Sequence, residues 1–178
     1  MTRLLVGITV AVVVFWATEI VAEMTLVRAG TAQAVNLSNS DQNADFEEFK
    51  AQVEPIFVKK RPGHARCYVC HGMSGAVGKM RSPFKLQELS PGKDFWTEDQ
   101  SRQNFEMVVT NLVDPVDPLK SKILVHPLAS SAGGEGMFHI GGQQFPSRDD
   151  PDWQKIEKWV QDLDAHRTSA GAAKNEEK

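Results

Sequence analysis

Apolar residues recur at helical spacing in three separate stretches of the chain. They are Phe46, Phe49 and Val53 in the first stretch, Phe105, Val108, Val109 and Leu112 in the second, and Trp153, Ile156, Trp159, Val160 and Leu163 in the third. This spacing gathers apolar side chains on one face of a helix. The pattern predicts an all-α domain in which the first and last helices pack against each other around the core.

Polar residues predict where these helices begin and end. Asp45 to Glu48 and Thr97 to Gln100 both fit the capping box, in which residues at the first and fourth positions satisfy each other's backbone amides. Asp150-Pro151 places a cap before a proline at the first helical position. Pro55 is expected to end or bend the first helix, because proline lacks an amide hydrogen.

The segments between the helices are less regular. Ser82-Pro83 predicts a short helical turn that continues through Leu86 and Leu89. Residues 121–128 form a short apolar segment whose type the pattern leaves open. Five glycines fall between residues 133 and 142, around Met137-Phe138-His139-Ile140. Glycine permits left-handed turns and close approach, so we expect this loop to lie against a flat surface.

The most apolar stretch lies near the start of the sequence. Leu4 to Ala17 is an unbroken run of apolar or small residues, preceded by an arginine, and Ala32 to Ala34 matches a signal-peptidase site. The run is shorter than the roughly 20 residues that span a bilayer, and a longer one would bury Glu19 and Glu23. We therefore favour a cleaved export signal over residues 1–34 rather than a retained membrane anchor. Either one places the domain in the periplasm or otherwise outside the cytoplasm.

The remaining chain is long enough for one domain with a single core. We expect a polar linker over residues 35–44, the domain over 45–166, and a disordered tail over 167–178, where small and charged residues dominate. The formal net charge is -3, with both signs mixed along the chain. This balance argues against a nucleic-acid partner.

The two cysteines of the sequence lie in one motif, Cys67-Tyr68-Val69-Cys70-His71. A CxxCH sequence is the attachment signature of a c-type haem. One tight turn presents both thiols to the two vinyl groups at the porphyrin edge, and the histidine that follows lies beneath the ring. The motif predicts one covalent haem c, bound through Cys67 and Cys70, with His71 as the proximal iron ligand.

Other chemistries use similar residues but fit this sequence less well. A thioredoxin-like redox pair needs a βαβ context, whereas the residues on either side of the motif are typical of a loop. Structural zinc takes four tetrahedral ligands, and the chain has no second cysteine pair. A disulfide between Cys67 and Cys70 is compatible with an oxidising compartment but would leave His71 without a role.

The order of these features resembles the cytochrome c family, in particular the cytochrome c-like monohaem domains of exported bacterial proteins from soil bacteria and planctomycetes. Three stretches between residues 46 and 163 carry the resemblance: Val53 to Phe57 running into Cys67 to His71, then Ser121 to Leu128, then Phe138 to Gly142 with Phe145 and Asp149 to Pro151. The resemblance implies a small helical domain with long loops around one haem.

The sixth iron ligand must come from a histidine or a methionine elsewhere in the chain. The candidates are His64, His126, His139, His166, Met73, Met80, Met107 and Met137. Mitochondrial-type cytochromes c usually supply a methionine, but the stretch that resembles the distal region here centres on His139. We expect His139 to be the ligand, with Met137 of the same loop as the alternative. Two histidines predict a lower reduction potential than a histidine and a methionine.

Three functions are compatible with such a domain. The first is an exported one-electron carrier with both axial positions filled, which exchanges electrons with redox partner proteins and is not an enzyme. The second is a peroxidase-like haem enzyme with an open distal site, in which His126 or His139 acts as the acid–base group. The third is an accessory haem subunit of a larger membrane redox complex. We favour the electron carrier.

Overall fold

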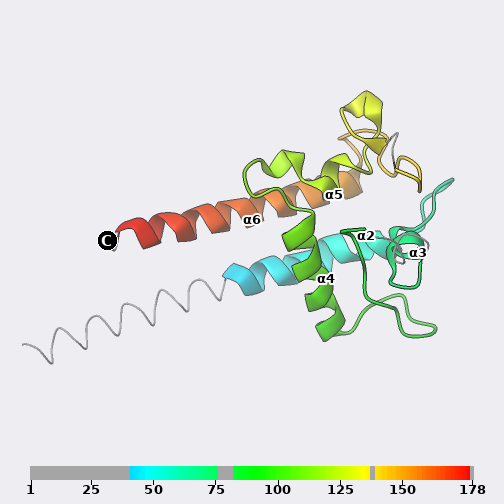
Figure 1. The fold of residues 1–178 in the computed structure, drawn as a ribbon, viewed down its shortest axis with the longest axis horizontal. Helices are drawn as coiled ribbons and strands as arrows, with labels where there is room; N and C mark the ends of the chain where they lie inside the picture. Colours follow the sequence, from blue (N-terminus) through cyan, green and yellow to red (C-terminus); the bar gives the residue numbers. More distant parts are fainter. Residues whose placement is uncertain (1–40, 76–81, 137–138, 177–178) are drawn as a thin grey trace, which may run out of the picture. The chain divides into compact units, whose positions relative to one another are not determined.

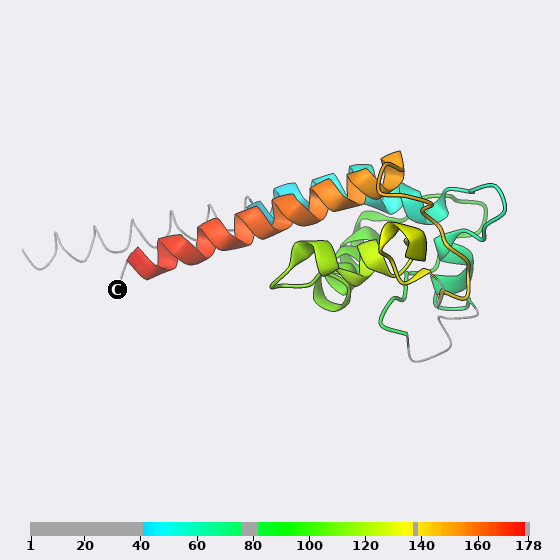
Figure 2. The same cartoon turned by 90° about the horizontal axis from the view of Figure 1, so that it is seen from above.

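Two helices from opposite ends of the chain pack together and carry the core. The computed structural model describes residues 41–75, 82–136 and 139–176, and residues 43–178 form one compact unit. The first helix is α-helical over residues 41–48 and continues through a π-helical segment, η1 (Phe49–Val53), into α2 (Glu54–Val58). The last helix is α6 (Pro151–Glu176). Figure 1 shows them side by side, in cyan and in orange to red, and Figure 2 shows the same arrangement from above.

Aromatic side chains fill the space between these two helices, as the hydrophobic spacing predicted. The rings of Phe49 and Trp159 lie 5.3 Å apart between centroids, and both side chains are fully buried. The predicted apolar face of α6 is buried along its whole length, from Trp153 to Leu163. Burial of such large side chains is the main favourable contribution to folding.

The first helix does not end at Pro55, because the π-helical segment accommodates the proline. The amide of Glu54 donates to the carbonyl of Phe49, one residue further back than in an α-helix. This wider winding shifts the hydrogen-bond register just before a residue that has no amide hydrogen. The helix therefore continues to Val58.

The remaining elements are short and connect the two long helices. They are α3 (Cys67–His71), α4 (Glu98–Asn111), η2 (Pro118–Lys120), α5 (Lys122–Val125) and η3 (Ser130–Ala132). No β-strand occurs within the three described ranges, although parallel bridges join Gly72 to Leu86 and Leu128 to Phe145. The all-α prediction is confirmed. The capping box of α4 is also confirmed, with Thr97 and Gln100 in both reciprocal hydrogen bonds.

Two predicted features of the helix ends are wrong. Asp45 does not cap the first helix but lies buried within it, where its carbonyl accepts a hydrogen bond from Trp159 Nε1 at 3.1 Å. Residues 41–44, assigned to the linker, are helical. At the other end, α6 continues to Glu176, so residues 167–176 are helical rather than disordered. Both errors arise because each helix extends beyond its apolar stripe.

The prediction of a short helix after Ser82-Pro83 is also wrong. This segment is extended, because its backbone groups pair with the cysteine motif instead of with one another. The amide of Leu86 donates to the carbonyl of His71 at 2.8 Å, and the amide of Met73 donates to the carbonyl of Leu86 at 3.1 Å. A helix over residues 82–89 would use those groups internally.

No helix among the described residues is both long and apolar enough to cross a membrane. The export segment predicted over residues 1–34 lies outside the described ranges.

Candidate functional site

The cysteine motif folds as one helical turn, α3. Residues three and four positions apart lie on the same side of a helix, so Cys67, Cys70 and His71 share one side of α3. The helix ends at Gly72, whose amide donates to the carbonyl of Tyr68 at 2.7 Å. The sequence spacing and the local fold therefore agree on this half of the site.

His71 is buried and held by the segment that follows the motif. Its Nδ1 lies 3.1 Å from the carbonyl oxygen of Phe84, and the Phe84 ring is 4.4 Å from the imidazole ring between centroids. Burial lowers the pKa of His71, and the hydrogen bond to Phe84 opposes this shift. A neutral imidazole with its Nδ1 hydrogen donated to a carbonyl presents Nε2 as a metal ligand.

His139 is held in the same way on the glycine-rich loop. Its Nδ1 lies 2.7 Å from the carbonyl oxygen of Gly142, and the amide of Gly142 donates back to the carbonyl of His139 at 2.9 Å. Gly142 has a φ of +82°, which favours glycine. Burial lowers the pKa of His139, against the opposing effect of the Gly142 carbonyl.

The structure brings His71 and His139 together at one cavity. Their ring centroids are 6.1 Å apart, and the ring planes differ by 19°. An imidazole nitrogen lies about 2.0–2.1 Å from a bound metal ion, and the ring centre roughly 1 Å further, so imidazoles on opposite sides of one ion have centres about 6 Å apart. The two Nε2 atoms have no hydrogen-bond partner among the described residues. The pair therefore matches the separation that one metal ion requires.

The cavity between the two histidines has a volume of about 450 Å³. Both cysteines lie on its wall, with apolar side chains from α2, α5 and α6, among them Phe57, Ile123 and Ile156. Pockets of a few hundred Å³ with mostly apolar walls are typical of cofactor sites. The donor set, the cysteines and the apolar walls fit a haem.

The chemistry of Cys67 differs from that of a redox-active cysteine pair. Neither cysteine is in a disulfide, and both are partly buried. Burial raises the pKa of Cys67 to about 11, whereas reactive dithiol pairs have a lowered thiol pKa. The structure therefore gives no support to the thioredoxin-like alternative.

His126 is a second histidine on the distal side of the cavity. Its ring is 5.3 Å from that of His139 between centroids and nearly perpendicular to it, at 84°. Its Nδ1 lies 3.3 Å from an oxygen of Glu135, which also binds Lys122. His126 is thus half-exposed at the edge of the cavity, while His139 is the imidazole nearly parallel to His71.

The other candidate ligands lie elsewhere or outside the described residues. Met107 is partly buried against the core, as expected, and Met73 is exposed. His166 lies within α6 rather than at its end, with Nδ1 2.7 Å from the carboxylate of Asp45. His64 lies beside Gly142. Met80 and Met137 fall outside the described ranges.

Part of the glycine-rich loop packs differently from the prediction. A side chain at Gly134 or Gly136 would collide with the carbonyl oxygen of Leu128, at 2.2 and 2.5 Å from the added Cβ atoms. These glycines therefore allow the loop to approach its own preceding segment. At the site itself, a Cβ added at Gly141 would lie 3.1 Å from the His139 ring, and Gly142 binds His139 through its backbone.

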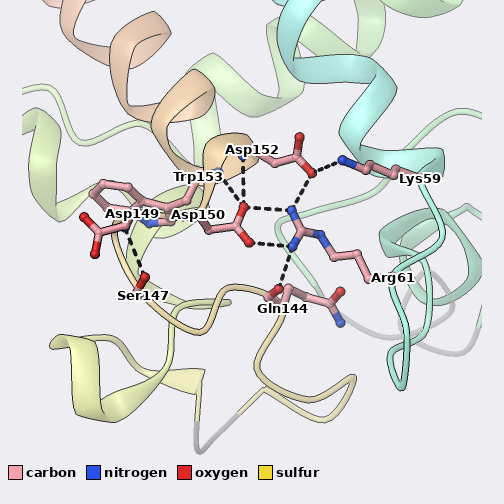
Figure 3. Close-up of polar contacts among 8 residues, drawn as sticks. All are labelled: Lys59, Arg61, Gln144, Ser147, Asp149, Asp150, Asp152 and Trp153. Carbon is pink, nitrogen blue, oxygen red and sulfur yellow. Dashed lines mark hydrogen bonds and ion pairs between the residues drawn. The ribbon is translucent and has the colours of Figure 1, made fainter.

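An ion-pair cluster beside the site was not predicted from the sequence. Arg61 binds the carboxylate of Asp150 with both terminal nitrogens, at 2.8 and 3.0 Å, and also contacts Asp152. Lys59 binds Asp152 at 2.7 Å (Figure 3). Asp150 also caps α6, as predicted, by accepting from the amides of Asp152 and Trp153. The sequence identified the cap but carried no signal that Arg61 would pair with it from 89 positions away.

No group of three or more potential metal-ligating side chains occurs in the described part of the chain. A haem iron needs only two, because the porphyrin supplies the other four ligands. No protein-family model, curated protein or solved structure matches this chain.

Proposed function

We propose that this protein is an exported monohaem c-type cytochrome that acts as a one-electron carrier. Cys67 and Cys70 hold the haem covalently, His71 is the proximal ligand and His139 is the distal ligand. The observation that carries the proposal is the pair of imidazoles, whose centroids lie 6.1 Å apart at a cavity that also contains both cysteines. The domain is cytochrome c-like in this respect, with a helical frame and long loops around one cofactor.

The chain's own residues prepare both ligands before any metal binds. Each imidazole donates its Nδ1 hydrogen to a backbone carbonyl, Phe84 for His71 and Gly142 for His139. These hydrogen bonds fix the tautomer and the ring orientation, and they make Nε2 a better ligand. When bound, haem supplies an iron that takes up and releases one electron.

Filled axial positions favour electron transfer over catalysis. An enzyme of the peroxidase type needs an open position next to an acid–base group. His126 lies close enough to serve as such a group if His139 does not bind the iron. The separation of 6.1 Å between the His139 and His71 ring centroids supports ligation by His139, and therefore the carrier.

The proposal includes electron exchange with redox partner proteins in the periplasm or otherwise outside the cytoplasm, where the predicted export segment would direct the domain. An accessory role in a membrane redox complex is the same chemistry with a permanent partner. Retention of residues 1–34 in the mature protein would favour the permanent partner.

Visible spectra of the purified, haem-loaded protein test the proposal. Both oxidation states should be six-coordinate and low-spin, without the band near the red edge of the visible that marks methionine–iron ligation. His139→Ala should become high-spin, whereas Met137→Ala and His126→Ala should retain the wild-type spectrum. A low-spin spectrum in His139→Ala, or rapid cyanide binding by the wild-type protein, would refute the assignment.

A further inference from the structure

We propose that Arg61 is a positioning residue that holds the loop of His139 in place and thereby keeps the sixth coordination position closed. The inference rests on the proposed function, because it concerns the stability of the His139 ligand. It means that the ion pair between Arg61 and Asp150 determines whether the haem acts only as an electron carrier or also binds external ligands.

Arg61 connects the loop before the cysteine motif to the segment after His139. Its Nη1 donates to the carbonyl of Gln144 at 3.2 Å and to Asp150 at 2.8 Å (Figure 3). Its guanidinium group lies 4.7 Å from the centre of the Phe145 ring. The Arg61 side chain thus binds the carbonyl of Gln144 and stacks on the ring of Phe145. It also pairs with Asp150, the cap of α6.

The residues that Arg61 holds are linked directly to His139. Gln144 Nε2 donates to the carbonyl of Gly141 at 3.0 Å, and Gly142 exchanges two hydrogen bonds with His139. The loop from His139 to Gln144 is therefore closed by its own hydrogen bonds and attached to the protein at Gln144. Movement of Gln144 would be transmitted to the imidazole through these short contacts.

Because they are largely buried, the ion pairs of Arg61 affect stability more than a surface salt bridge does. The side chains of Arg61, Asp150 and Asp152 are 15%, 11% and 6% exposed. Removal of the arginine leaves Asp150 to two backbone amides and Asp152 to Lys59, and the loss of one member of a largely buried ion-pair cluster is destabilising. The bidentate fork matches carboxylate geometry, so lysine cannot reproduce it.

Carbon monoxide provides a direct measure of how firmly His139 is held. In the reduced protein, carbon monoxide binds the iron only when the bond between iron and His139 Nε2 breaks, and no electron is transferred. In the haem-loaded Arg61→Gln protein we expect the binding rate to rise roughly tenfold, the change that about 1.4 kcal/mol produces. Arg61→Lys should fall between Arg61→Gln and the wild type.

Lys59→Gln is the matched control. Lys59 binds the same Asp152 from the same loop, but its side chain is 53% exposed and it has no contact with Gln144. We expect its carbon monoxide rate to stay within about twofold of the wild-type rate, as for sites that do not interact. Amide hydrogen exchange gives a second measurement, in which Arg61→Gln should lose protection over residues 139–145.

A purely structural role for Arg61 would lower the melting temperature and leave the carbon monoxide rate unchanged. A rate within about twofold of the wild type in a folded Arg61→Gln protein would overturn the inference. If Arg61→Gln does not fold, the carbon monoxide rate of Asp150→Asn is measured in its place. Asparagine still caps α6 but weakens the ion pair with Arg61. A high-spin wild-type spectrum would instead refute the proposed function, so the two failures are distinguishable.

Discussion

The two histidines of the site present similar rings but are held by different kinds of structure. His71 follows Cys70 directly in a helical turn, so its position is largely set by the motif itself. His139 lies on an irregular loop, and its position depends on Gly142, Gln144 and Arg61. The backbone of His71 is thus placed by the helical turn of its own motif, whereas the loop of His139 is also held by Arg61, from a distant part of the sequence.

This difference suggests that the two sides have different roles in the protein. In the proposed cytochrome, His71 would stay close to the haem even if its bond to the iron broke, because the thioether bond of the adjacent Cys70 would keep it nearby. A ligand on a loop can leave, at a cost set by the contacts that hold the loop. The distal side is therefore where sequence changes can tune coordination, and the predictions below test this asymmetry.

The largest effect is expected from removing the ligands themselves. His71→Ala should abolish the normal low-spin spectrum and reduce the yield of haem-loaded protein, since the residue belongs to the attachment motif. His139→Ala should keep the covalent haem and bind carbon monoxide rapidly, with a change above the 10–100-fold typical of outer-shell substitutions. Visible spectroscopy and stopped-flow mixing measure both. Equal haem yields from the two variants would contradict the asymmetry.

A substitution in the core should lower stability and leave the carbon monoxide rate unchanged, which is the opposite of what we expect for the distal loop. Phe49 is fully buried and contacts Phe57, Phe105 and Trp159. Truncation of such a ring costs about 3–5 kcal/mol, so Phe49→Ala should lower the free energy of unfolding by that amount. Chemical denaturation of the haem-loaded protein measures it.

Phe49→Ala should leave the carbon monoxide rate of the folded protein close to the wild-type rate, in contrast to Arg61→Gln. A large change in that rate would mean that the core, and not the ion-pair cluster, holds His139.

Two glycines with the same backbone conformation allow a matched comparison. Gly142 and Gly92 have φ values of +82° and +75°, so alanine at either position costs about 1–2 kcal/mol of backbone strain. A side chain at Gly142 would also lie 3.3 Å from His64, whereas Gly92 has open space around it.

Gly142→Ala should therefore lose at least as much stability as Gly92→Ala in thermal unfolding. Only Gly142→Ala should also weaken the low-spin spectrum, because its carbonyl holds the His139 ring. Identical spectra for the two variants would show that the Gly142 turn does not control the ligand.

The smallest effects concern pH and oppose each other in sign. Burial raises the pKa of Glu54, although hydrogen bonds from Asn104 and Ser101 oppose this. The folded protein therefore binds this proton more tightly than the unfolded chain, and stability falls as pH rises through the raised pKa. Glu54→Gln should remove that decline and change stability at neutral pH by about 1 kcal/mol or less.

Asp150 should show the opposite dependence. Burial alone would raise its pKa, but hydrogen bonds from Arg61 and from backbone amides outweigh burial and hold it below the ordinary value. Its contribution is present above the ordinary pKa and is lost as pH falls below it. Denaturation curves from about pH 2 to 8 separate the two groups, and a Glu54→Gln protein with the wild-type pH profile would contradict the assignment.

The predicted and observed structures agree where the information is local. The stripe from Trp153 to Leu163, the capping box at Thr97 and the CxxCH turn each depend on residues within one helix. They differ where backbone groups find distant partners. Residues 82–89 look helical in isolation, yet the amide and carbonyl of Leu86 pair with His71 and Met73, and the amide of Gln87 pairs with the Asn104 side chain.

The sequence by itself determined the cofactor prediction, the two predicted iron ligands and the helices of the core, because each follows from the residues of one short segment. Only the tertiary structure placed His139 and His71 at one cavity, with ring centroids 6.1 Å apart, because that contact joins two segments far apart in the sequence. Arg61 and Asp150 are 89 positions apart and form a partly buried pair. Periodicity carries no information about such pairs, since contacts of this kind are set by how the helices pack.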